Sequence, residues 1–241
     1  PIFLTGEFAR PGAYAIRRGE RLSSVIARAG GLTAEAYPFG AVFTRESVRR
    51  SERVALDRLS RELNSALISA AATEQIETGA LNTFSGLSRQ IADAPATGRV
   101  VIEADPAVLQ VRPELDVVLQ PGDRVIMPKR PSSVLVTGDV LSPGAKQFVA
   151  GRTVDVYLEQ AGGFQRSADR NRVFVVFPNG AAKPISVSPF SYSSVRVPPG
   201  STIVVPKDAT PFGLLAFARD VSQVLSQLAI TAASLAVISN N

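Results

Sequence analysis

The sequence contains one pattern twice, and this duplication restricts the folds that the chain can adopt. Residues 4–7 (LTGE) and 11–13 (PGA) recur 132 positions later as residues 136–139 (VTGD) and 143–145 (PGA). Nothing is inserted or deleted between these matches, so the two segments are copies of one supersecondary unit. The same offset aligns Gly19 with Gly151 and residues 29–32 (AGGL) with residues 161–164 (AGGF).

Each copy has the pattern of a small α/β module. A strand leads into a Pro-Gly turn, a second strand follows, and a short helix ends at a Gly-Gly pair, because glycine accepts the left-handed conformation. Thr153 is a candidate N-cap for the second helix. Residues 173–177 then form a strand that reaches a hairpin turn at Asn179-Gly180. The helices are expected to bury Leu22, Val25, Ile26 and Ala29 in the first copy and Val154, Tyr157, Leu158 and Ala161 in the second.

The first copy is longer than the second. Its closing segment, residues 119–129 (LQPGDRVIMPK), matches residues 197–207 (VPPGSTIVVPK) at an offset of 78, so the first copy holds 132 − 78 = 54 extra residues. They fall where the second copy has its Asn179-Gly180 turn. A helical hairpin returns its ends close together, so it can replace that turn. The two helical patterns, separated by Gly79, contain Val54, Leu59, Leu63, Ala66, Leu67 and Ala70, and then Phe84, Leu87 and Ile91.

Composition argues against catalysis. The chain has 241 residues, of which 45% are hydrophobic, enough for packed cores. It has no cysteine and no histidine, which removes thiolate chemistry, the commonest general base and the commonest metal ligand. We therefore predict that the chain is not an enzyme and that it has no catalytic, cofactor-binding or metal-binding residues.

Two local motifs have both a structural and a functional interpretation. Residues 138–146 superficially resemble a phosphate-binding loop but lack its Gly-Lys-Ser/Thr ending, so we interpret them as a turn. Arg49, Arg50 and Arg53 form a basic cluster at the start of the insertion. Its structural interpretation is a solvated helix face, and its functional one is contact with an anion.

The repeated motifs resemble those of a known domain. The pattern of strand, GxxxxPG turn, short helix, AGG, strand and closing PGDxVxxPK resembles the soluble-ligand-binding β-grasp (SLBB) domain. Tandem copies followed by an amphipathic helix resemble the bacterial outer-membrane polysaccharide export proteins, the Wza-type capsule and exopolysaccharide translocons. The N-terminal export domain and lipidated cysteine of that family have no counterpart in residues 1–241, and we expect natural sequence to precede Pro1.

The pattern and the resemblance together predict an α+β architecture. Residues 1–130 form the first β-grasp-like SLBB domain, with a helical-hairpin insertion at about residues 49–99. Residues 131–208 form the second SLBB domain. Residues 210–241 form a C-terminal amphipathic membrane helix that is expected to contribute to an outer-membrane barrel.

The C-terminal segment has two distinct faces. Residues 214–238 contain no proline or glycine, and 25 helical residues span roughly 37 Å, enough to cross a hydrocarbon core of about 30 Å. In a membrane barrel one face would line a pore and the other would contact lipid; a soluble helix packed on a neighbouring domain is the alternative. The predicted pore-lining residues are Arg219, Ser222, Gln223, Ser226, Gln227 and Ser234. The predicted lipid-facing residues are Leu214, Phe217, Val221, Val224, Leu225, Leu228 and Leu235.

The resemblance implies polysaccharide export through a periplasmic ring of identical subunits. The implied partners are polysaccharide as the transported substrate, outer-membrane lipid and an inner-membrane polysaccharide co-polymerase; the implied location is the outer membrane and periplasm. The alternatives are a periplasmic carbohydrate-binding or scaffold module with a docking helix, and, because the net charge is +5, nucleic-acid binding. Neither binding class needs a charge-free tail beyond Asp220, so we predict that nucleic acid is not a partner.

Overall fold

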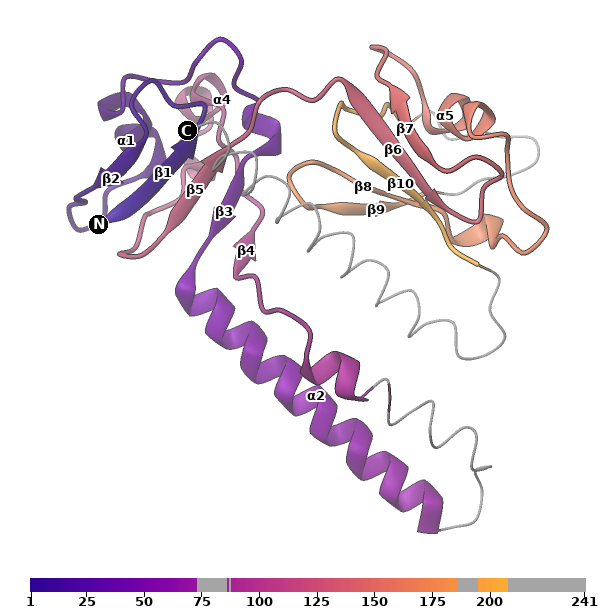
Figure 1. The fold of residues 1–241 in the computed structure, drawn as a ribbon. Coiled ribbons are helices and arrows are strands. Elements are labelled where there is room, and N and C mark those ends of the chain that lie inside the picture. Colours follow the sequence, from indigo (N-terminus) through magenta and orange to yellow (C-terminus); the bar gives the residue numbers. More distant parts are fainter. Residues whose placement is uncertain (73–85, 87, 186–194, 208–241) are drawn as a thin grey trace. The chain divides into compact units, whose positions relative to one another are not determined.

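A computed structural model describes residues 1–72, 86, 88–185 and 195–207 (Figure 1). The chain divides into two compact units, one containing Pro1–Phe43 and Val101–Asn241 and the other Thr44–Val100. The described strands form two five-stranded mixed sheets with a few helices, which confirms the predicted α+β class. The predicted C-terminal helix, residues 210–241, lies outside the described residues.

The first sheet has the strand order β2-β1-β5-β3-β4. β1 pairs with β2 in antiparallel fashion and with β5 in parallel fashion, so both ends of the first copy meet at the centre of the sheet. Its strands are β1 (Ile2–Gly6), β2 (Gly12–Tyr14), β3 (Val42–Thr44), β4 (Arg99–Val100) and β5 (Arg124–Met127). Its helical elements are α1 (Leu22–Arg28), η1 (Pro38–Gly40), α4 (Pro106–Val111) and η2 (Pro113–Leu115).

The second sheet repeats this topology with the order β7-β6-β10-β8-β9. β6 and β10 are parallel, whereas the β6–β7, β8–β10 and β8–β9 pairs are antiparallel. The Asn179-Gly180 turn joins β8 to β9, and Phe177 N donates to Ala181 O at 2.8 Å across it. The elements are β6 (Ser133–Gly138), β7 (Gly144–Gln147), α5 (Val154–Gln160), η3 (Arg170–Arg172), β8 (Phe174–Val176), β9 (Ala182–Pro184) and β10 (Thr202–Val205).

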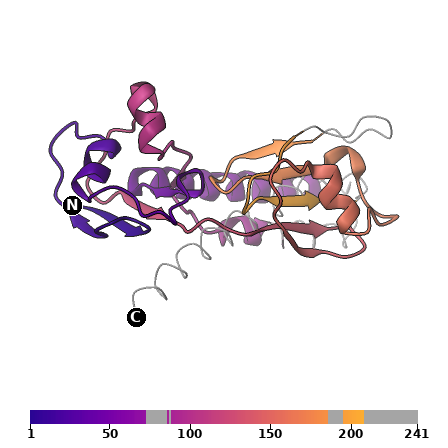
Figure 2. The same ribbon diagram turned by 90° about the horizontal axis from the view of Figure 1, so that it is seen from above.

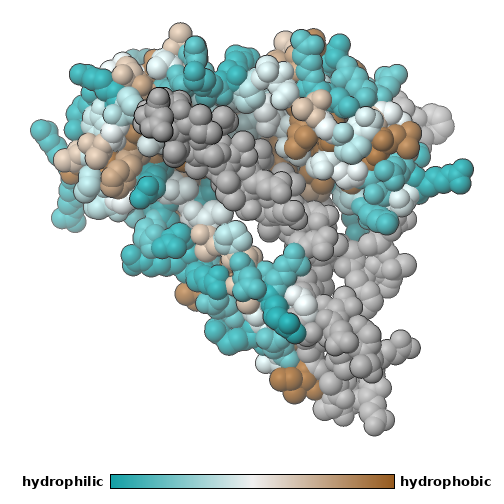
Figure 3. Space-filling model, viewed as in Figure 1, coloured by the Kyte–Doolittle hydropathy of each residue, from teal (hydrophilic) through white to brown (hydrophobic). Residues whose placement is uncertain are grey.

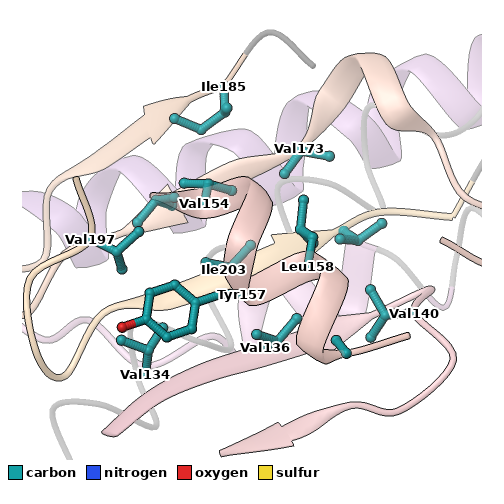
Figure 4. Packing of buried hydrophobic residues seen from close by; sticks show 13 residues of the cluster. Val134, Val136, Val140, Val154, Tyr157, Leu158, Val173, Ile185, Val197 and Ile203 are labelled. Atoms are coloured by element: carbon teal, nitrogen blue, oxygen red, sulfur yellow. The ribbon is translucent and has the colours of Figure 1, made fainter. Parts of the chain in front are cut away.

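The core of each repeat lies between its helix and one face of its sheet, as Figure 4 shows for the second repeat. Figures 1 and 2 show α5 lying along one side of the second sheet. All eight helix positions that the periodicity predicted are at most 4% exposed, which confirms the predicted inward faces. The Gly-Gly pairs end both helices with positive φ, as expected for C′ glycines; Gly31 N donates to Ile26 O, and Gly163 N to Leu158 O, both at 2.9 Å.

The two cores place their largest ring on different elements. In the second repeat the ring is Tyr157 on α5, which is fully buried in the same core cluster as Val175 of β8. At the equivalent positions of the first repeat, α1 carries Val25 and β3 carries Phe43, both fully buried. The exchange keeps the total core volume similar, which is the type of change that packed cores tolerate best.

A close backbone contact explains the glycine of the LTGE and VTGD motifs. Gly6 and Gly138 end β1 and β6 with φ of +83° and +92°. A Cβ at these positions would lie 2.1 Å from Met127 O and 2.0 Å from Val205 O, respectively. The residue that follows each glycine donates its N–H to that same carbonyl oxygen. The motif therefore has a structural role at the corner where the chain leaves the sheet, and residues 138–146 form a strand end, a hairpin and a new strand rather than a phosphate loop.

The insertion begins with a long helix, α2 (Glu46–Ala72), three residues before the predicted boundary. It follows β3, at the position equivalent to the β8–β9 turn. Ser60 on α2 contacts Ser88 through hydroxyl groups 3.1 Å apart, and residues 88–92 are helical, so two helical segments are paired.

α2 contains the predicted helical pattern, but two of its apolar positions face outward: Val54 is 64% exposed and Leu59 45%. A two-helix pair buries only a narrow line of side chains, and here that line runs through Glu52, Leu56, Ser60 and Leu63.

Candidate functional site

The predicted pore-lining and lipid-facing residues all belong to the C-terminal segment. They fall between Leu214 and Leu235, outside the described residues, so their two-faced arrangement stays a prediction. Among the helices of the described ranges, none combines the length and the apolarity that a membrane crossing requires. The same ranges contain no group of three or more metal-ligating side chains.

The second sheet has an apolar outer face, on the side away from α5. Side chains alternate along a strand, so the neighbours of the inward-facing Val175 and Ile203 point outward. On the central strands β8 and β10 these outward side chains are only 0–4% exposed, whereas the outward-facing Leu135 on the flanking strand β6 is 41% exposed. We call the four buried outward residues the outer-face centre: Phe174, Val176, Thr202 and Val204.

The strand register places the outer-face centre in two adjacent rows. Thr202 lies opposite Val176, and Val204 lies opposite Phe174. The rows continue onto the flanking strands at Leu135 and Thr137 of β6, and at Ala182 and Pro184 of β9. Burial is confined to the two central strands, because Ala182 and Pro184 are exposed and Thr137 is half-buried.

The equivalent face of the first sheet is mixed: Val42, the counterpart of Phe174, is 3% exposed, but polar residues occupy other outward positions. The counterpart of Thr202 is Arg124, which is exposed and whose guanidinium carbon lies 4.9 Å from the centroid of the Phe3 ring. The counterpart of Val204 is Ile126, which is half-buried. Arg124 therefore covers Phe3 while its charge stays in water, an arrangement typical of a cation–π contact at a surface.

The motif acids after Gly6 and Gly138 have different partners in the two repeats. Glu7 accepts a short hydrogen bond from the Thr33 hydroxyl and lies 3.8 Å from Lys129 Nζ. Lys129 also lies 2.8 Å from Glu35, and its hydrogen bond lowers the pKa of Glu35. In the second repeat Asp139 Oδ2 is buried and has no hydrogen-bond partner among the described residues. The acidic corner is thus an ion-pair cluster in one repeat only.

In the first repeat, Arg10 and Arg28 connect the β1–β2 hairpin to α1. Arg28 donates to Ala15 O at 2.9 Å, pairs with Glu20 at 2.9 Å and lies 5.7 Å from the Tyr14 ring centroid. Arg10 donates to Arg28 O at 2.9 Å. The second repeat has Ser142, Lys146, Arg152 and Gln160 at the positions of Arg10, Tyr14, Glu20 and Arg28, so this fastening is not a feature of the module.

The basic cluster of the insertion is paired with nearby carboxylates. Glu46 accepts from Arg49 at 2.8 Å and from Arg50 at 3.1 Å, and these hydrogen bonds lower its pKa to about 2. Arg53 lies 3.3 Å from Asp57 and donates to Ala92 O at 2.7 Å. This pairing favours the structural interpretation of a solvated helix face, which agrees with the mainly hydrophilic surface of α2 in Figure 3.

The outer-face centre is the feature that differs most between the repeats, and it was not predicted from the sequence. A signal for it exists: residues 173–177 (VFVVF) and 203–205 (IVV) are continuous apolar runs, which are typical of strands buried on both faces. The equivalent segments 41–45 (AVFTR) and 124–127 (RVIM) contain polar residues at outward positions.

Two family models match separate segments of the chain. Residues 1–47, which carry β1 to β3, match the SLBB domain. Residues 142–228, which carry β7 to β10 and extend into the C-terminal segment, match the family described as capsule biosynthesis GfcC C-terminal.

Curated relatives align with most of the chain. It is 30% identical over 190 residues to the polysialic acid transport protein KpsD of Escherichia coli, a match that covers 78% of this chain and 32% of KpsD. It is 29% identical over 170 residues to the uncharacterized protein YjbG of Escherichia coli strain K12, covering 69% of this chain and 65% of YjbG. The chain thus spans about a third of the length of KpsD. The SLBB match, the GfcC-like segment and the similarity to KpsD together support placing the chain with the polysaccharide export proteins.

Proposed function

We propose that this chain is a subunit of the bacterial cell envelope machinery that exports polysaccharide. The observation that carries the proposal is the tandem β-grasp repeat in a chain that aligns over 78% of its length with a polysialic acid transport protein. Polysaccharide is then cargo that passes along the subunits, and the chain makes or breaks no bond in it.

The proposed assembly is a homo-oligomeric ring in the periplasm that continues into the outer membrane. The C-terminal segments form a helical barrel, with Gln223, Ser226 and Gln227 toward the lumen and Val221 and Leu228 toward lipid. The sequence pattern supports this arrangement, because polar side chains facing hydrocarbon are costly whereas polar side chains facing a water-filled lumen are not. An inner-membrane polysaccharide co-polymerase would deliver the glycan to the ring.

Particle size tests the assembly. The full chain, purified in mild detergent, is expected to form a monodisperse ring visible by electron microscopy and several times heavier than the 25.5 kDa monomer by light scattering. A monodisperse monomer with an intact C-terminus would overturn the ring.

Cysteine labelling tests the two faces of the barrel, and the absence of native cysteine makes the labelling specific. In intact outer membranes, Gln227→Cys is expected to react with a water-soluble maleimide, whereas the adjacent Leu228→Cys is expected to be protected until detergent is added. As a second readout, Leu228→Lys should block insertion, because a lysine in hydrocarbon costs roughly 2.5–3.5 kcal/mol per subunit, whereas Gln227→Lys should insert. Equal labelling of both positions would contradict the barrel and favour a periplasmic scaffold with a docked helix.

A further inference from the structure

The positive charge of the chain is concentrated in the hairpin and the helix of the first repeat. The net charge of the whole chain is +5. Residues 10–28 contain five arginines and one glutamate, a net charge of +4, which leaves +1 for the rest of the chain. All five arginines are exposed. We call them the arginine patch: Arg10, Arg17, Arg18, Arg21 and Arg28.

Hydrogen bonds link the arginine patch across β2, α1 and the loop between them, which lie next to one another in Figure 1. Arg10 donates to Arg28 O at 2.9 Å, and Arg28 donates to Ala15 O at 2.9 Å. In the loop, Arg17 N donates to Glu20 Oε2 at 2.8 Å, and Glu20 also lies 2.9 Å from Arg28. The side chain of Glu20 is only 10% exposed, whereas that of Arg28 is 44% exposed. The part of this surface that meets solvent is therefore positive.

The contacts of the arginine patch position guanidinium groups but leave most of their charge uncompensated. Arg10 and Arg21 donate to the backbone carbonyls of Arg28 and Pro113, which carry no net charge. Within the described ranges, the guanidinium groups of Arg17 and Arg18 make no hydrogen bond and no ion pair. The arginines of α2 differ, because there each basic group of the cluster has a carboxylate three or four residues away. Pairing of that kind suits a structural role, whereas open charges suit an external anion.

The second repeat shows that the module folds without these arginines. Residues 142–160, the equivalent range, contain two basic and two acidic residues and carry no net charge. The two sheets nevertheless have the same strand order. Like charges that lie close together repel one another, so an unneutralised group of five adds nothing to folding. The positions equivalent to the arginine patch are Ser142, Val149, Ala150, Thr153 and Gln160.

We propose that the arginine patch binds the carboxylate groups of an acidic polysaccharide, so that the cargo of this chain is an acidic glycan. The inference rests on the proposed export function, in which polysaccharide passes along the subunits. A guanidinium group presents paired N–H donors in one plane, and these match the two oxygens of a carboxylate. A ring of subunits repeats the patch, so one polymer bridges several patches while each contact stays weak enough to release it.

The composition of the patch favours a glycan over an anionic membrane. Residues 10–28 contain five arginines and no lysine, whereas a lipid surface attracts both cations through its diffuse negative potential. Segments that lie on a membrane also insert large apolar side chains between the headgroups. Residues 10–28 expose no large apolar side chain. The patch therefore has the charge for an anion but lacks the apolar contacts for a bilayer.

Binding of two polymers that differ in charge tests the proposal. The full chain in mild detergent is titrated with polygalacturonate, which has a carboxylate on each sugar, and with dextran, which is neutral. Polygalacturonate is expected to bind at least tenfold more tightly. The difference should vanish at about 1 M salt, where the Debye length is about 3 Å. Equal affinity for the two polymers at low salt would overturn the proposal.

Matched double variants locate the binding site. Arg17→Gln with Arg18→Gln removes two charges that have no described side-chain partner, and it is expected to weaken polygalacturonate binding about tenfold. The control, Arg49→Gln with Arg50→Gln, removes the same number of charges from α2 and should leave the affinity unchanged. Equal weakening by both pairs would mean that only the net charge of the chain matters, and the patch would not be the site.

Two further measurements separate the glycan from a membrane and from the ring. Vesicles that contain phosphatidylglycerol should bind the parent chain and the Arg17→Gln, Arg18→Gln variant equally. If the variant lost vesicle binding and kept its affinity for polygalacturonate, the partner would be an anionic membrane and the proposal would be wrong. Particle size in detergent is measured separately. A ring without a preference for polygalacturonate rejects only the acidic cargo, and a monomer with that preference rejects only the ring.

Discussion

The two repeats share a topology but differ on the sheet face that the topology leaves free. Both place a parallel pair at the centre of the sheet, end their helix at a Gly-Gly pair and leave the sheet at a glycine. On the outer face the first repeat has Arg124 above Phe3, whereas the second has a buried apolar centre. The duplication has therefore retained the features that build the module, whereas the outer face has diverged between the copies.

The largest expected effect comes from the shared corner. Gly138→Ala would place a Cβ 2.0 Å from Val205 O at a φ of +92°. Because the obstacle is backbone that belongs to the central strand, the sheet itself must shift, and we expect a loss of about 3 kcal/mol or more in the free energy of unfolding. Gly6→Ala should cost a similar amount in the first repeat, where the distance to Met127 O is 2.1 Å. Chemical denaturation followed by circular dichroism measures both.

A matched glycine separates the steric clash from the effect of positive φ. Gly151 has a φ of +83°, and a Cβ added to it would meet no atom within 4 Å. Gly151→Ala should therefore cost only about 1 kcal/mol, the ordinary strain of a left-handed alanine. Equal losses for Gly138→Ala and Gly151→Ala would mean that the corner contact is not the reason for the motif.

A smaller effect is expected from exchanging the core rings. Tyr157→Val removes the ring of the second core and should cost about 2–4 kcal/mol, and Val175→Phe alone should cost about 1–3 kcal/mol through overpacking. Together the two changes give the second repeat the arrangement of Val25 and Phe43. If the rings occupy the same space, the double variant should recover about 1–2 kcal/mol relative to the sum of the single variants.

The ring exchange has a control within the same side chain. The Tyr157 hydroxyl accepts a hydrogen bond from Val149 N at 3.0 Å and donates a longer one to Val149 O at 3.4 Å, so Tyr157→Phe tests the contribution of these two bonds without removing the ring. It should cost about 1 kcal/mol, because the 3.0 Å bond is the stronger of the two and one hydrogen bond usually contributes about that much. If the stability losses of Tyr157→Val and Val175→Phe simply add in the double variant, the two rings do not occupy the same space in the core.

Much of the module could be predicted from the sequence because its signals are local and repeated. The buried helix positions, the Gly-Gly helix ends and the Asn179-Gly180 hairpin follow from periodicity and turn chemistry, and the offset change from 132 to 78 predicts where the insertion lies. The inward face of α2 was not predictable in the same way. Its buried line includes Ser60, whose burial depends on contact with Ser88, and no apolar pattern marks such a contact.

The candidate surface was harder to predict than the fold. Outward side chains on a sheet have no fixed polarity, since an open face can be solvated or covered. The apolar runs at β8 and β10 indicate strands that are buried on both sides. In the first repeat Thr44 and Arg124 interrupt the equivalent runs, so the signal is lost when one pattern is derived from both copies together. The predicted pore-lining and lipid-facing residues stay predictions, because they lie outside the described residues.

The smallest expected effect concerns the ion-pair cluster of the first repeat, which has no counterpart among the described residues of the second. Lys129 donates to Glu35 at 2.8 Å, which lowers the pKa of Glu35 and raises that of Lys129. At the equivalent positions the second repeat has Ser167 and Lys207, so the pair has no counterpart there. In the carboxyl NMR spectrum, Lys129→Gln should return the Glu35 pKa toward its ordinary value, whereas Lys207→Gln should leave it unchanged.

The direction of the pH dependence follows from the lowered pKa of Glu35. A carboxylate whose pKa is lower in the folded chain stabilises the fold above its unfolded pKa, near 4.5, and this contribution is lost as the pH falls through the folded value. Because Glu35 and Lys129 are both more than 60% exposed, solvent screens the pair, and its effect on unfolding should be slight. Salt at about 1 M, where the Debye length is about 3 Å, should shrink the pKa difference between the parent chain and Lys129→Gln. If Lys129→Gln and Lys207→Gln changed the Glu35 pKa equally, the change would reflect the net charge of the chain and not the ion pair with Lys129. The acidic corner would then no longer distinguish the repeats.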